Sequence, residues 1–291
     1  MGKIIAYLKG NRLEVIFIFV IVVFAAFFRL YRIPEYMTFL GDEGRDARVV
    51  RRLIVNLDPV LIGPMTSVST EAGHMYLGPL YYYLMAPVMI LSNLSPVGPA
   101  VMVAILSLFT LLLIWWMGRS WFHPLVGIIA SVLYAISPTV IIHARSSWNP
   151  NIMPFFALLS IWSIYKIIQP SDLKANSYQP KAHIWFLILG VSLAFVLQSH
   201  YLGLLLFPTA SIFWLLKLKV LIKNHQSTKS FLLNSGFCLL IFLLLMSPLL
   251  IFDLRHDWLN FKSIFAFFTN RETSINLKVY RGFTKIIPIT T

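Results

Sequence analysis

The chain has 291 residues, of which 58% are hydrophobic and only 12% are charged, and its mean hydropathy is +0.77. A soluble domain is usually about 45–50% apolar and roughly 25% charged, so this composition excludes a soluble enzyme. The net charge of +13 does not by itself indicate a nucleic-acid partner, because the basic residues of a membrane protein must first be sorted by membrane side.

The first predicted element is a transmembrane span within residues 1–30. Residues 13–28 are apolar except for Glu14, and they follow Lys3, Lys9 and Arg12 and precede Arg29. No small-residue cleavage site follows this run, so it is interpreted as an uncleaved span and not as a signal peptide. The basic residues before it predict a cytoplasmic amino terminus.

Further apolar runs predict additional spans, at residues 100–117, 125–142, 152–168, 184–197, 202–216 and 231–252. Residues 77–91 are ambiguous, because a helix of about 15 residues rises only about 22 Å, short of the roughly 30 Å of hydrocarbon in a bilayer. Pro79 and Pro87 also interrupt this run. The close succession of residues 184–197 and 202–216 requires a tight turn at residues 198–200.

The distribution of basic residues favours a topology in which residues 77–91 do not cross the membrane. In that case Arg119 faces the cytoplasm together with seven lysines, Lys166, Lys174, Lys181, Lys217, Lys219, Lys223 and Lys229. The sequence then predicts an all-α polytopic membrane protein with seven spans. An outer catalytic loop covers residues 31–97, six spans lie within residues 98–252, and an outer juxtamembrane segment covers residues 253–291.

The basic residues assigned to the outer side within residues 1–260 are all arginines. They are Arg29, Arg32, Arg45, Arg48, Arg51, Arg52, Arg145 and Arg255. Arginine presents a rigid fork of donors that matches phosphate, whereas lysine is a hydrated point charge. The alternative explanation is that arginine side chains snorkel at the membrane interface.

The first outer loop contains the segment Gly41-Asp-Glu-Gly-Arg-Asp46, with apolar residues at helical spacing after it. This pattern predicts an amphipathic helix in the outer membrane interface, with Asp42 and Glu43 in its first turn. Either acid could serve as a general base, with Arg45 binding an anion one turn later. The competing interpretation is structural, since acids in a first turn interact favourably with the helix dipole.

Other polar residues on the predicted outer side are candidates for donor or acceptor binding, because ionisable groups at membrane depth are costly. The candidate phosphate-binding residues are Arg45, Arg48, Arg145 and Arg255, and the candidate substrate-binding residues are His74, Tyr81, Tyr82, Asn149, His200 and His256. Each of these residues could instead have a purely structural role, such as membership of an aromatic belt or of a surface ion pair. The histidine spacing specifies no metal site, so no cofactor is predicted and dependence on a divalent cation is left undetermined.

In this order, these residues resemble the GT-C superfamily of membrane glycosyltransferases, closest to the family 39-like group that contains protein O-mannosyltransferases and aminoarabinose transferases. The resemblance covers residues 28–268. Its motifs are Asp42-Glu43-x-Arg45, Gly78-Pro-Leu-Tyr-Tyr82, Arg145-Ser-Ser-Trp-Asn-Pro-Asn151 and Leu254-Arg-His-Asp257. It implies a seven-span module with interfacial helices in the first outer loop, which agrees with the topology above.

The resemblance implies inverting transfer of a sugar from a polyprenyl-phosphate donor to an acceptor hydroxyl of a lipid, glycan or protein, outside the cytoplasmic membrane. Asp42 would be the base, Glu43 its partner and Arg45 a contact to the donor phosphate. The chain departs from many relatives at Gly78, where they have a basic residue or histidine just before the proline. It also departs in the second outer loop, where many have an acid and this chain has Asn149 and Asn151.

Neither the sugar, the acceptor nor the oligomeric state follows from the sequence. Two rival functions stay open at this stage, a transporter or flippase of a lipid-linked saccharide and a non-catalytic truncated membrane subunit. The near absence of charge inside the predicted spans argues against transport. Whether the chain is a fragment of a longer enzyme is also left open.

Overall fold

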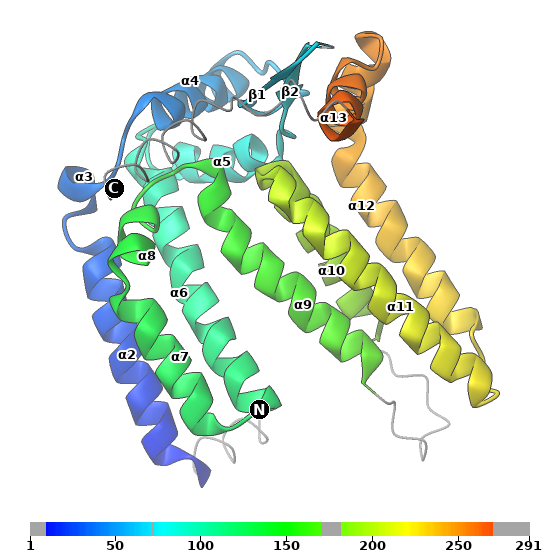
Figure 1. The fold of residues 1–291 in the computed structure, drawn as a ribbon. Helices are drawn as coiled ribbons and strands as arrows, with labels where there is room; N and C mark the ends of the chain where they lie inside the picture. Colours follow the sequence, from blue (N-terminus) through cyan, green and yellow to red (C-terminus); the bar gives the residue numbers. More distant parts are fainter. Residues whose placement is uncertain (1–9, 72, 170–181, 270–291) are drawn as a thin grey trace, which may run out of the picture.

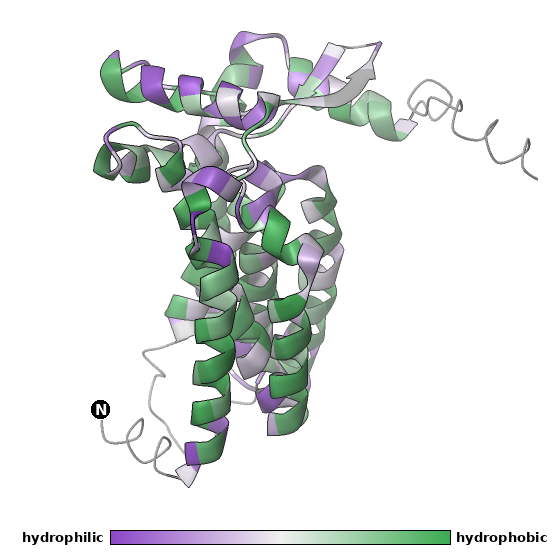
Figure 2. Cartoon of the chain, turned by 90° about the vertical axis from the view of Figure 1, so that its left-hand side faces the viewer, coloured by the Kyte–Doolittle hydropathy of each residue, from purple (hydrophilic) through white to green (hydrophobic). Residues whose placement is uncertain are grey.

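A computed structural model describes residues 10–71, 73–169 and 182–269. Long helices form a bundle, and a layer of short elements lies across one end of it (Figure 1). The bundle helices are α2 (Arg12–Leu30), α6 (Val97–Trp121), α7 (Pro124–Ile136), α8 (Pro138–His143), α9 (Met153–Ile168), α10 (Ala182–Ser199), α11 (Leu206–Lys223) and α12 (Lys229–Arg255). Hydrophobic residues run along these helices, while hydrophilic residues gather in the layer (Figure 2).

The layer at the end of the bundle is built mainly from the first predicted outer loop. It consists of α3 (Ile33–Tyr36), α4 (Gly41–Val55), β1 (Met65–Thr70), β2 (Gly73–Tyr76), α5 (Leu80–Leu91) and α13 (Leu259–Thr269). The predicted helix that begins near Asp42 is confirmed as α4. The short antiparallel hairpin of β1 and β2 was not predicted. Its β2 strand meets α13 where the Tyr76 N–H donates to Asn260 Oδ1 at 2.8 Å.

Among the described residues, five helical segments are long and apolar enough to cross a membrane, namely Arg12–Leu30, Val97–Trp121, Asn149–Ile168, Tyr201–Lys223 and Lys229–Arg255. Three apolar helices are shorter, Leu80–Leu91, Pro124–Ile136 and His183–Ser199. The fold is therefore a predominantly helical, multi-pass membrane fold. The count of seven spans stays a prediction, and Lys3, Lys9, Lys174, Lys181 and residues 270–291 lie outside the described residues.

Two predicted helix boundaries have clear outcomes. The tight turn at residues 198–200 is confirmed, because α10 ends at Ser199 and a 3₁₀ turn, η2 (Tyr201–Leu205), leads into α11. The run at residues 125–142 is not one continuous helix, since it divides into α7 and α8 at Ser137 and Pro138. Proline has no backbone N–H and its ring obstructs the preceding turn, which ends α7 there.

Arg29, at the carboxyl end of α2, joins three helices of the bundle. Its side chain is fully buried. Its Nε donates to Ser107 Oγ on α6 at 2.9 Å, and its Nη2 donates to the carbonyl oxygen of Tyr134 on α7 at 3.1 Å. In an unbroken helix that carbonyl would accept from residue 138, which is a proline. Arg29 thus supplies the donor that Pro138 lacks, and holds α2 and α7 together below the layer.

We predict that R29M lowers the free energy of unfolding by about 1–3 kcal/mol, because it leaves buried carbonyl groups without donors while it keeps an apolar side chain of similar length. Thermal unfolding in detergent measures this change. R51M, at an exposed position of α4, is the matched control and should behave as wild type. An unchanged or raised unfolding temperature for R29M would mean that the cost of burying the cation outweighs its hydrogen bonds.

Candidate active site

The candidate site forms where α4 packs on α5. Val50 of α4 belongs to the same buried cluster as Tyr81, Tyr82 and Met85 of α5. This cluster extends into the bundle through residues of α6, α9 and α10. The apolar stripe of α4 therefore fixes this helix against the bundle, and the acids in its first turns are positioned by that packing.

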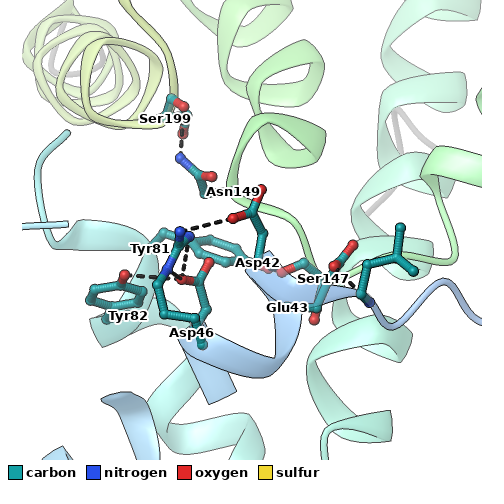
Figure 3. Close-up of polar contacts among 10 residues, drawn as sticks. Asp42, Glu43, Asp46, Tyr81, Tyr82, Ser147, Asn149 and Ser199 are labelled. Carbon is teal, nitrogen blue, oxygen red and sulfur yellow. Dashed lines mark hydrogen bonds and ion pairs between the residues drawn. The ribbon is translucent and has the colours of Figure 1, made fainter. Parts of the chain in front are cut away.

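Arg45 bridges two carboxylates of its own helix (Figure 3). Its Nη1 donates to Asp42 Oδ1 at 2.8 Å, and its Nε donates to Asp46 Oδ1 at 2.9 Å. From α5, the Tyr82 hydroxyl donates to the same Asp46 oxygen at 3.0 Å. One chain of contacts therefore runs from the core of the layer through Asp46 and Arg45 to Asp42.

The two aspartates occupy opposite environments. The Asp42 side chain is 51% exposed, whereas that of Asp46 is 0% exposed. Burial raises the pKa of Asp46 to about 6, although Arg45 and Tyr82 favour its ionised form. The other oxygen of this carboxylate, Oδ2, is buried and has no hydrogen-bond partner within the described part of the chain. Burial also raises the pKa of Tyr82, and the nearby Asp46 adds to that effect.

Glu43 is buried and its carboxylate is occupied by local contacts. It accepts the Leu40 N–H at 3.0 Å, which caps the start of α4, and the Ser146 hydroxyl at 2.5 Å. Ser146 also forms a parallel bridge with Thr38. Glu43 thereby ties the start of α4 to the second predicted outer loop, and its geometry is that of a helix cap.

Tyr81 and Asn149 connect the layer to the bundle. The buried Tyr81 hydroxyl donates to the Ser147 carbonyl at 2.5 Å, and burial raises the pKa of Tyr81. Asn149 Nδ2 donates to the Ser199 carbonyl at the end of α10 at 2.8 Å (Figure 3). The two bonds tie Tyr81 of α5 to the segment after α8, and tie that segment to the end of α10.

The glycine at position 78, where many members of the resembling family have a larger residue, is explained by its surroundings. A Cβ at this position would lie 2.0 Å from Gln198 Oε1. Gln198 is buried, and the same oxygen accepts the N–H of Leu80 at 3.3 Å. Gln198 therefore fills the space that a side chain at position 78 would need, and it fastens the start of α5 to α10.

Other predicted site residues lie apart from this chain of contacts. Arg145 donates to the carbonyls of Phe28 at 3.2 Å and Tyr31 at 2.7 Å, and its guanidinium lies 5.2 Å from the centre of the Tyr36 ring. It thus holds the end of α2, and burial lowers its pKa. Arg48, on the next turn of α4, is exposed, as is Arg255 at the end of α12.

The three candidate histidines are dispersed. His74 is exposed on β2, His200 Nδ1 accepts the N–H of Leu202 at 3.1 Å, and His256 stacks on the ring of Phe252. Binding roles for these histidines, Arg145 and Arg255 stay predictions. No contact among the described residues links their side chains to Asp42. Within the described residues, no group of three or more His, Cys, Asp or Glu side chains could hold a metal ion.

Asp46 is the site residue that the sequence did not single out. A signal was present, because Asp46 lies four residues before Val50, and residues at this spacing share one face of a helix. A carboxylate on the buried face of a helix needs hydrogen-bond donors, and Arg45 and Tyr82 supply them here.

Residues 77–252 match the family of dolichyl-phosphate-mannose-protein mannosyltransferases. The chain belongs to this family. The matched region starts just before α5 and ends within α12, so α4 and Asp42 precede it. Membership confirms the resemblance to GT-C glycosyltransferases. Among curated proteins, no sequence matches the chain.

Solved structures of an oligosaccharyltransferase from Archaeoglobus fulgidus have a similar fold. The complex of AglB with an inhibitory peptide and a dolichol-phosphate gives a TM-score of 0.57 at 14% identity, over 98% of this chain and 40% of that one. The apo form gives 0.54 at 16% identity, over 68% and 25%. The complex with Zn and sulfate gives 0.53 at 14% identity, over 85% and 38%. The chain thus spans two fifths or less of these proteins, whose likeness confirms a GT-C-type fold.

The raised pKa of Asp46 predicts how D46N changes stability with pH. The pKa is about 6 in the folded protein against 3.8 ordinarily, so the ionised group costs the folded state about 3 kcal/mol above pH 6. This cost declines as the pH falls from 6 towards 4, where the aspartate is protonated in both states. We therefore expect D46N to be more stable than wild type at pH 8 and similar to it at pH 4, by thermal unfolding in detergent. A difference that does not vary with pH would contradict this prediction.

Proposed function

We propose that this protein transfers a sugar from a polyprenyl-phosphate donor to an acceptor hydroxyl on the outer face of the cytoplasmic membrane, with inversion. The observation that carries the proposal is a half-exposed carboxylate, Asp42, held by Arg45 at the start of a helix that lies across the end of a membrane bundle. The dolichol-phosphate bound to the archaeal oligosaccharyltransferase supports a lipid-phosphate donor.

In the proposed reaction Asp42 takes the proton of the acceptor hydroxyl. The acceptor oxygen bonds to the anomeric carbon of the sugar as the bond from that carbon to the phosphate oxygen breaks, and polyprenyl phosphate leaves. Charge grows on the leaving phosphate in the transition state, so nearby arginines stabilise that state more than the ground state.

Arg45 and Arg48 are the arginines best placed for this role. Three of the five N–H donors of Arg45 face Asp42 and Asp46, which leaves two for an anion. Arg48 is exposed one turn further along α4. Glu43 then contributes by holding the first turn of α4 in place.

We expect D42N to reduce transfer from polyprenyl-phosphate sugars by about 10²–10⁴-fold, because the amide cannot accept the proton. The assay uses membranes that contain the full protein and a panel of such donors. D58N is the matched control, since Asp58 is an exposed carboxylate paired with Arg52 at 2.8 Å, away from the site. Undiminished activity in D42N would remove Asp42 as the base.

The proposed membrane topology is tested by cysteine labelling in a variant that lacks Cys238. R51C on α4 should react with a membrane-impermeant maleimide in intact cells, because α4 is placed outside. K219C near the end of α11 should react only after permeabilisation, since its lysine is assigned to the cytoplasm. Reaction of both positions from the same side would overturn the outer location of the site.

A further inference from the structure

The carboxylate of Asp46 is hard to explain by stability alone. It is fully buried, one of its oxygens has no partner in the described part of the chain, and its pKa is raised by burial. An apolar residue at this place on α4 would continue the stripe formed by Ala47 and Val50 and avoid the cost of burying an acid. The group therefore calls for a role beyond packing.

Its contacts indicate that role. Asp42 is half exposed, and an exposed ion pair such as Asp42–Arg45 is worth under about 1 kcal/mol, too little to fix either side chain. The buried Asp46 fixes the Arg45 guanidinium, however, because Arg45 Nε and Nη2 lie 2.9 Å and 2.8 Å from Asp46 Oδ1. Tyr82 fixes this same oxygen from α5, a second element of the layer.

We infer that Asp46 is a positioning residue that orients Asp42 for proton abstraction by holding Arg45, while Tyr82 anchors Asp46 to α5. This inference rests on the proposed function, since it assumes that Asp42 is the base. Asp46 itself is buried and touches no substrate. Its ionised form binds the guanidinium more strongly than its protonated form, because the hydrogen bonds from Arg45 are then assisted by charge.

The mechanism predicts a pH signature. The charged and titratable groups that face Asp46 are Arg45 and Asp42 on α4, and Tyr82 and Tyr81 on α5. As the pH falls below about 6, Asp46 takes up a proton, Arg45 is held less firmly and kcat declines. Because Asp46 makes no substrate contact, KM for the donor should stay unchanged.

The test compares D46N and Y82F with D58N and Y83F, measuring kcat, KM and the pH profile with a polyprenyl-phosphate sugar. D46N keeps the shape but not the charge, so kcat should fall by about 10- to 100-fold with KM unchanged, and the decline of kcat near pH 6 should disappear. Y82F removes a hydrogen bond that lowers the pKa of Asp46, so that decline should move to higher pH. Within the residues that the structure describes, the hydroxyl lost in Y83F bonds only to the Val60 backbone. Both controls should match wild type.

The outcomes separate this inference from the proposed function. Loss of activity in D42N together with wild-type kcat and pH profile in D46N would overturn the positioning role and leave the base in place. A rise in KM that accounts for the whole D46N defect would also overturn it, because it would indicate direct substrate binding. Full activity in D42N would instead refute the proposed function. Thermal unfolding of D46N at pH 8 distinguishes each of these results from misfolding.

Discussion

The arrangement of the candidate site depends on the burial of one carboxylate between two helices of the layer. Asp46 lies on the apolar stripe by which α4 packs on α5, and it is compensated there by Arg45 and Tyr82. A buried acid without partners is costly, so Asp46 needs these two contacts. Because Arg45 also contacts Asp42, the predicted base belongs to the same network. The apolar packing of α4 on α5 thus buries Asp46, and the contacts that this burial requires place the predicted base.

The layer is joined to the bundle by polar side chains that satisfy backbone groups at helix ends. Gln198 receives the N–H of Leu80 at the start of α5, Tyr81 donates to the Ser147 carbonyl, and Arg145 donates to carbonyls that follow α2. In a membrane protein, irregular backbone near the hydrocarbon must find partners within the protein, because water is scarce there. These contacts explain how a short, irregular layer is positioned firmly enough to carry a site.

Several of the residues that the sequence suggested for catalysis or for donor or substrate binding have such structural contacts. Glu43 caps α4, Arg145 holds the end of α2 and His200 caps the turn before α11. Arginine, histidine and glutamate at a membrane boundary serve as hydrogen-bond partners for helix ends as readily as they bind ligands. Residue type and spacing cannot distinguish these roles, since the difference lies in which backbone groups are nearby.

The sequence by itself determined the membrane class, most helix positions, the tight turn before α11, the interfacial helix α4 and the GT-C family, because apolar run length and helical periodicity are local properties. The hairpin of β1 and β2, the division of α7 from α8 and the exclusion of a side chain at Gly78 by Gln198 were decided by the tertiary structure. So was the part played by Asp46. Each of these depends on contacts between segments far apart in the chain, and a buried acid can be told from an exposed one only when the helix that covers it is in place.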